Sequence, residues 1–118
     1  MPQQPSSPAQ QFIETLRNVQ MSLDADRPKD CKIISTAFLM SGEQIKIGSA
    51  YAADPNLIVF TAVRQKKTVI VVARYDTIMQ CVFHFEKGER RMITFELEPP
   101  PQLGFSVGSR SGSESKTS

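Results

Sequence analysis

Few side chains in this sequence could carry out acid–base or nucleophilic chemistry. The single histidine, His84, lies in the segment Cys-Val-Phe-His-Phe, whose alternation places it on the opposite strand face from Cys81, Phe83 and Phe85. The sequence contains no GxSxG, HExxH or glycine-rich phosphate loop. We therefore expect no catalytic residue, no cofactor and no enzymatic activity.

The residues that could bind a metal ion are also poorly spaced for it. Asp24, Asp26 and Asp30 are close together, but they lack the glycine and the terminal glutamate of a calcium loop. Cys31 and Cys81 form no CxxC pair, which argues against a zinc site. We expect no metal site and two thiols that pack as small apolar groups.

Basic residues gather at two positions between apolar runs. We interpret both positions as hairpin tips on one end of the sheet, forming a single electrostatic patch of Arg64, Lys66, Lys67, Lys87, Arg90 and Arg91. Such tips are often merely solvated, but several charges together could bind an acidic protein or phosphates. Neither tip contains an aromatic residue for base stacking, and the net charge of +2 is small for a nucleic-acid binder.

The chain from Cys31 to Glu98 follows the period of β-strands. Six strands are predicted, at 31–40, 44–52, 57–63, 68–75, 78–85 and 90–98. Ile45, Ile47 and Tyr51 are expected to share one face. In the last strand, Ile93, Phe95 and Leu97 are expected to alternate inward. Short turns between the strands predict antiparallel neighbours in a meander. We expect a mainly β fold in which about six strands close into a small barrel or form a strongly bent sheet.

One helix is predicted before the strands, at residues 8–23. Ser7 is a favourable N-cap, and Gln10 completes a capping box with it. An apolar stripe follows, formed by Phe12, Leu16, Val19 and Leu23. This stripe either packs on the chain's own sheet or forms a face for a partner, and a homodimer through paired helices is the simplest version of the second alternative.

The domain boundaries follow from composition. The 118 residues suit one domain, at residues 8–98, with a disordered N-terminus at 1–7. Residues 99–118 begin with three prolines and continue as a Ser/Gly-rich tail that we also expect to be disordered. No signal peptide or membrane span is predicted, so we expect an intracellular protein, with nucleus and cytoplasm not distinguished.

The run LIVFTAVRQKKTVIVVARYDTIMQCVFHF, residues 57–85, resembles the middle strands of pleckstrin-homology-like domains. The similarity lies in a strand that ends in basic residues and in the step from Asp76 through Ile78 to Cys81. It implies a PH-like barrel that serves as a docking module. Such domains usually finish with a C-terminal helix, whereas here Pro99–Pro101 follow the last strand. In the family, phosphoinositides bind basic residues of the first hairpin, and the corresponding turn, Ser41–Gln44, has none.

The sequence therefore favours a non-catalytic protein-interaction module that acts within a larger complex. The expected partner is another protein, bound through the electrostatic patch or through the apolar helix stripe. Weak nucleic-acid binding through the basic tips is the first alternative and is not favoured. Phosphoinositide binding is the second alternative.

Overall fold

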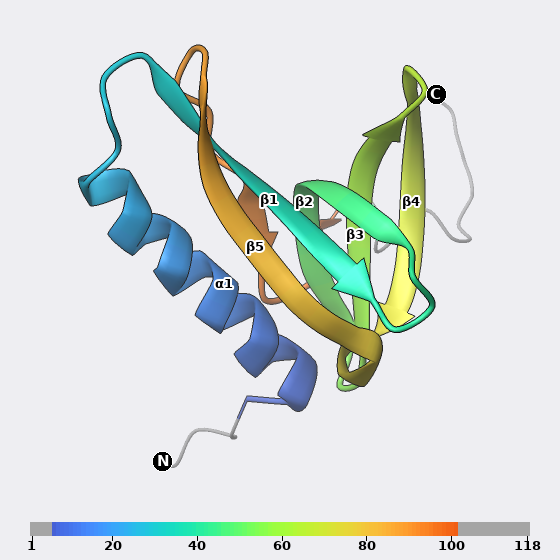
Figure 1. Cartoon of the computed structure of the whole chain (residues 1–118). Helices are drawn as coiled ribbons and strands as arrows, with labels where there is room; N and C mark the ends of the chain where they lie inside the picture. Colours follow the sequence, from blue (N-terminus) through green and yellow to red (C-terminus); the bar gives the residue numbers. More distant parts are fainter. Residues whose placement is uncertain (1–5, 102–118) are drawn as a thin grey trace, which may run out of the picture.

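The computed structural model describes residues 6–101 and contains one helix followed by a strongly bent sheet (Figure 1). The elements are α1 Pro8–Ala25, β1 Cys31–Leu39, β2 Gln44–Asp54, β3 Leu57–Arg64, β4 Lys67–Arg74, the short 3-10 helix η1 Tyr75–Thr77, β5 Ile78–Lys87 and β6 Thr94–Glu96. The disorder predicted for residues 1–5 and 102–118 lies outside the described residues.

The start of α1 is the predicted one. The Ser7 hydroxyl accepts a hydrogen bond from the Gln10 amide at 3.2 Å, and the Gln10 side chain accepts one from the Ser7 amide at 3.1 Å. This capping box satisfies two of the donors that a helix N-terminus leaves free. The helix ends at Ala25, two residues beyond the expected end.

The strand order in the sheet is β4-β3-β2-β1-β5, with β6 beside β2. The meander is confirmed for β1 to β4, but the expected pairings of β5 with β4 and of the last strand with β5 are both wrong. The three residues of η1 carry the chain from one edge of the bent sheet to the other, where β5 pairs with β1 along its whole length. The sheet is therefore mainly antiparallel and bent, and β4 and β5 do not pair to close it into a barrel.

Strand β2 bends at Gly48. The register with β3 shifts between Ile47 and Ser49, and a Cβ at Gly48 would lie only 3.1 Å from the Thr61 carbonyl oxygen. A bulge inserts one residue and reverses the faces that follow it. Ile47 is accordingly buried before the bulge, whereas Tyr51 after it points to the outer face, so the predicted shared face was wrong for Tyr51.

The sheet forks at this bend. β1 pairs with β2 only as far as Thr36 and Lys46, and beyond the bulge β6 takes the place beside β2, parallel to it. The last strand is shorter than predicted, because only Thr94–Glu96 joins the ladder and the preceding residues run as a loop. Its predicted alternation is correct, with Phe95 buried between exposed neighbours.

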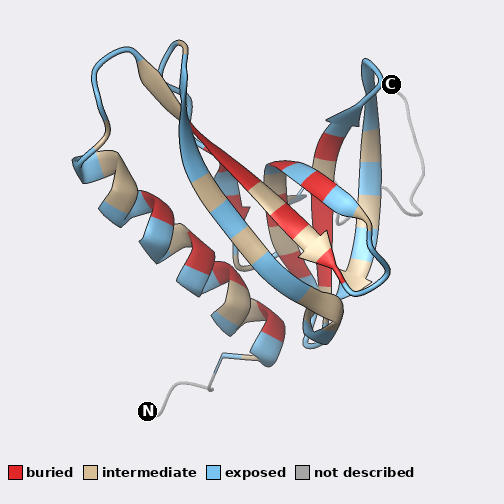
Figure 2. Ribbon diagram, viewed as in Figure 1, coloured by how far each residue is buried: buried red, intermediate tan, exposed pale blue. Residues whose placement is uncertain are grey.

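Helix α1 packs on its own sheet and contacts β2, β6, β1 and η1 (Figure 2). Its buried residues are Ala9, Ile13, Leu16 and Gln20. Of the predicted stripe, Leu16 is buried, Phe12 and Leu23 are half-buried against the core, and Val19 is 38% exposed. The helix is therefore rotated toward the side that carries Ala9. The small side chain of Ala9 allows a close approach to the β2–β3 turn, where the Ala9 amide donates to the Pro55 carbonyl at 2.9 Å.

Candidate functional site

Polar side chains of α1 hold β6 and the loop before it in place. Gln10 donates to the Leu97 carbonyl at 3.2 Å, and Arg17 donates to the Phe95 carbonyl at 2.8 Å. Gln20 donates to the Ile93 carbonyl at 2.9 Å and accepts from the Ile93 amide at 2.8 Å. These hydrogen bonds supply partners for backbone groups on the edge of β6 that is not paired with another strand. They also fix the position of Ile93 beside the fork.

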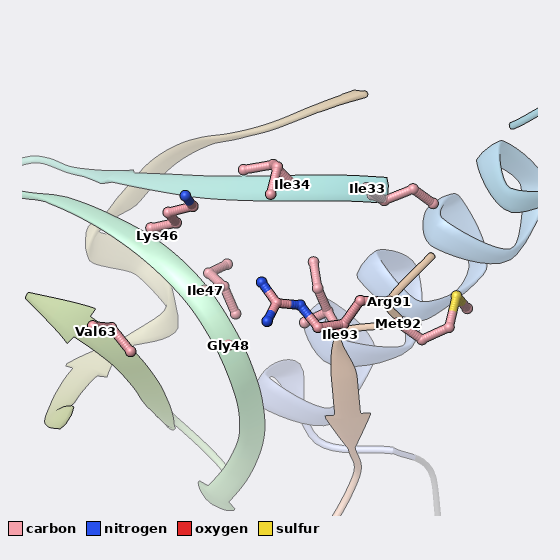
Figure 3. A pocket seen from close by; sticks show the side chains of 9 residues that line it. All are labelled: Ile33, Ile34, Lys46, Ile47, Gly48, Val63, Arg91, Met92 and Ile93. Atoms are coloured by element: carbon pink, nitrogen blue, oxygen red, sulfur yellow. The ribbon is translucent and has the colours of Figure 1, made fainter. Parts of the chain in front are cut away.

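An open cleft of about 450 Å³ lies at the fork, between β1, β2 and the loop that precedes β6 (Figure 3). Its lining residues are Ile33, Ile34, Lys46, Ile47, Gly48, Val63, Arg91, Met92 and Ile93. The cleft exists because β1 and β2 separate beyond the Gly48 bulge. Its walls are mainly aliphatic and its charged residues are all cations.

Arg91 is the distinctive side chain of this cleft. Within residues 6–101, the other five arginines each have a carboxylate oxygen within 4.0 Å, and Arg91 has none. Its guanidinium extends into the cleft toward Ile47, while Lys46 projects from β2 toward β1 (Figure 3). A guanidinium cannot lose its proton in a protein, so this charge is balanced only by water or by an anion.

Unlike Arg91, Lys46 has a carboxylate in its neighbourhood, that of Glu86 on β5. A hydrogen bond with His84, at 3.1 Å, lowers the pKa of Glu86, and the charges of Lys46, His84 and Lys32 add to this effect. The imidazole of His84 is exposed on the outer face, as the alternation predicts. Glu86 does not line the cleft, so Arg91 remains the stronger candidate for binding an anion.

The six residues of the predicted electrostatic patch lie in three different environments: two form ion pairs, three lysines are exposed, and Arg91 lines the cleft. Arg64 forms an ion pair with Glu43 at 2.6 Å, and Arg90 forms one with Asp24 at 2.7 Å. Hydrogen bonds from Arg90 and then from Arg27 lower the pKa of Asp24 below its ordinary value of 3.8. Two of the six charges are therefore already compensated.

The remaining members of the patch are Lys66, Lys67, Lys87 and Arg91. The two lysines of the β3–β4 hairpin lie at an exposed tip, where Gln65 and Lys66 both have positive φ, as a two-residue type I′ turn requires. The β3–β4 and β5–β6 tips project from the same end of the sheet in Figure 1. The same cleft is lined by Val63, at the base of the β3–β4 tip, and by Arg91, in the β5–β6 tip. The two basic tips therefore flank the cleft.

The free edge of β4 is a second candidate site. β4 is the last strand of the sheet on its side, and only β3 pairs with it. Ile70 is 63% exposed and Val72 is 58% exposed on its outer face. β5 forms the other end of the sheet, so both ends of the sheet offer unpaired strands.

Other chemistry finds little support in the part of the chain that the structure describes. No cluster of three or more histidine, cysteine or acidic side chains suited to a metal ion occurs within residues 6–101. Burial raises the pKa of Cys81 to about 11, so its thiol stays protonated at neutral pH. α1 is not apolar enough to qualify as a membrane-crossing helix.

The sequence indicates Arg91 as a candidate binding residue but does not indicate the cleft that it lines. The cleft depends on the separation of β1 from β2, and no local pattern predicts a fork between two strands joined by a short turn. The glycine inside the predicted strand at 44–52 was the available signal, because an isolated strand glycine often marks a bulge.

No family model matches the chain, and no curated protein or solved structure matches it.

Proposed function

We propose that this protein is a non-catalytic docking module that binds a strand of a partner protein along the free edge of β4. The observation that carries the proposal is an edge strand with five consecutive apolar residues, Val69–Ala73, and charges only near its ends. Natural edge strands are usually protected by central charges, prolines, bulges or covering elements. β4 has no charge or proline at its centre, and its ladder with β3 contains no bulge.

The backbone of β4 suits the addition of a strand. The amide of Tyr75 donates toward β3, to the Asn56 carbonyl at 3.0 Å. Because backbone groups alternate along a strand, those of Thr68, Ile70 and Val72 point away from β3. An extended segment laid beside β4 would pair with these groups, and its side chains would cover the exposed Ile70 and Val72.

The side chains add a hydrophobic contribution to this pairing. Full burial of an aliphatic side chain contributes about 1.5–3 kcal/mol, and Ile70 and Val72 are both more than half exposed. Two such residues therefore contribute roughly 2–4 kcal/mol to a gross interaction energy, to which the backbone hydrogen bonds are added. This suits a partner that remains bound within an assembly.

A place in a larger complex is supported by the two open ends of the sheet. A module with one free edge binds one neighbour, whereas β4 and β5 together allow two. The resemblance of residues 57–85 to PH-like domains, in which docking is the usual role, points the same way. That resemblance supports the proposal by analogy of fold, which does not by itself establish a function.

Nucleic-acid and phosphoinositide binding are less well supported as main functions. Two of the six patch residues, Arg64 and Arg90, are paired with carboxylates. The β1–β2 turn at 41–43 contains Glu43 and no basic residue, so the hairpin that would bind a phosphoinositide lacks its cations. A phosphate binder loses affinity steeply as salt rises, whereas an apolar strand edge does not, so a salt titration of partner binding distinguishes them.

The experiment compares two substitutions at Ile70. Proline removes the amide that points away from β3 and preserves the ladder with β3, so Ile70→Pro should abolish partner binding in a folded protein. Threonine keeps that amide and the branched shape, so Ile70→Thr should retain most of the binding. The full chain and both variants are first examined by analytical ultracentrifugation for self-association, and then by cross-linking and capture from extract with mass spectrometry.

The proposal is supported by a partner, or a self-associated species, that Ile70→Thr retains and Ile70→Pro loses. It is contradicted if Ile70→Pro, shown to be folded by circular dichroism, keeps all of its partners. Equal loss in both variants would mean that the Ile70 side chain, rather than the strand edge, is the binding element.

A further inference from the structure

We propose that the cleft at the fork binds a small amphiphilic anion, in which a single anionic head group contacts Arg91 and an aliphatic body lies along the aliphatic lining of the cleft. This inference is independent of strand docking, because it uses the loop before β6 and the separation of β1 from β2 rather than the outer edge of β4.

The size and lining of the cleft fit a small molecule. Its volume of about 450 Å³ lies within the range of roughly 300–1,000 Å³ that is usual for ligand sites. Six of its nine lining residues are aliphatic or methionine: Ile33, Ile34, Ile47, Val63, Met92 and Ile93. Such sites typically combine an apolar wall with a small number of polar groups that set the orientation of the ligand.

The charge of the cleft determines the class of its ligand. Arg91 and Lys46 are its only ionisable lining residues, and both are cations. Arg91 differs from the other arginines within residues 6–101 in having no carboxylate within 4.0 Å, and its guanidinium is directed into the cleft (Figure 3). A carboxylate or phosphate head group would supply the missing counter-charge and could accept two parallel hydrogen bonds from the guanidinium.

The walls are held rigidly enough to recognise a ligand. Gln20 fixes Ile93 through two hydrogen bonds and so restrains the segment that carries Arg91 and Met92. On the opposite wall, Ile34 and Ile47 are nearly fully buried parts of the core. Because both walls are already in place, a ligand loses little affinity to ordering the protein.

The first measurement is isothermal titration calorimetry of the full chain with four probes. Decanoate and decyl phosphate carry the same aliphatic chain on two different anionic head groups, decanol carries that chain without a charge, and acetate carries the charge without the chain. All four are used below the concentration at which they form micelles. We expect saturable 1:1 binding of decanoate or decyl phosphate, at least tenfold tighter than decanol or acetate. Whichever of the two anions binds more tightly identifies the head group.

The matched variants are Arg91→Gln and Arg90→Gln, which remove the same charge from adjacent positions of one loop. We expect Arg91→Gln to weaken binding of the anion at least tenfold, since a charge-assisted bidentate contact is lost. Arg90→Gln should change it less than twofold, because Arg90 is bound to Asp24 and does not line the cleft. Arg91→Lys keeps the charge and should retain more affinity than Arg91→Gln.

Amide chemical shifts recorded with the bound anion locate the site. Perturbations should centre on 46–48 and 91–93. The inference is overturned if neither anion binds at millimolar concentration, if decanol binds as tightly as decanoate, or if the two glutamine variants weaken binding equally. Should Arg91→Gln prove unfolded, Arg91→Lys and the chemical shifts decide the matter, because perturbations elsewhere would also refute the site.

Discussion

The hydrogen bonds between Gln20 and Ile93 offer the sharpest test of the structure. Gln20 is only 3% exposed, and within residues 6–101 its amide group is the sole hydrogen-bond partner of both backbone groups of Ile93. Gln20→Leu preserves the size of the side chain and its burial but removes both hydrogen bonds. The Ile93 amide and carbonyl would then lie buried without partners.

The magnitude follows from those two groups. Each buried polar group left without a partner costs about 1–3 kcal/mol, and the more apolar leucine recovers part of this cost. We therefore expect Gln20→Leu to lower the free energy of unfolding by roughly 2–4 kcal/mol. For a domain of this size each kcal/mol corresponds to about 4–8 °C in the melting temperature, so the expected decrease is roughly 8–32 °C.

Gln11→Leu is the control, because it makes the same substitution on the exposed side of α1. Its side chain reaches only the Ser6 carbonyl, at 2.9 Å, and its loss should change stability by no more than about 0.5 kcal/mol. Urea unfolding of both variants gives the free energies, and amide exchange at Ile93 reports whether the segment detaches locally. A loss below about 1 kcal/mol in Gln20→Leu, or an unchanged exchange rate at Ile93, would refute the role assigned to Gln20.

Three further predictions concern titration, reactivity and the hairpin turn. Because the pKa of Asp24 is lowered in the folded protein, its ion pairs stabilise the fold above pH 3.8, and this contribution is lost as pH falls through the folded pKa. The melting temperature, measured from pH 6 downward, should therefore fall less steeply in Asp24→Asn than in the unsubstituted protein. In a Cys31→Ser variant, Cys81 should react with iodoacetamide far more slowly than a free thiol at pH 8, since a pKa of about 11 in place of 9.0 leaves roughly a hundredfold less thiolate. Replacing Gln65 and Lys66 by Asn and Gly should raise the free energy of unfolding by about 1–2 kcal/mol, because both positions have positive φ; an unchanged urea midpoint would contradict this.

The elements that depend on local signals were predictable from the sequence. The Ser7 capping box placed the start of the helix, and strand alternation placed Phe95 in the core and His84 outside it. Turns rich in glycine, proline and aspartate separated the strands at nearly the correct residues. Each of these features is determined by neighbours within a few positions in the chain.

The arrangement of the elements was less predictable, because it depends on the bend of β2. Alternation cannot reveal that a bulge at Gly48 reverses the faces of the second half of the strand, which is why Tyr51 was misplaced. The buried helix face was also missed, since Gln20 is polar and only its pairing with the Ile93 backbone makes its burial favourable. Pairing of β5 with β1 likewise follows from the curvature of the whole sheet and not from the short connection that precedes β5.

The Gly48 bulge is the local feature from which the proposed anion site derives. A side chain at this position would crowd the Thr61 carbonyl at 3.1 Å, so glycine permits β2 to bend against β3. That bend turns β2 away from β1, and the gap is filled only partly by β6, which leaves the cleft in which Arg91 lies. The cleft and the arginine without a carboxylate partner within residues 6–101 thus both follow from one glycine, whereas the free edges of β4 and β5 follow from the order of the strands in the sheet.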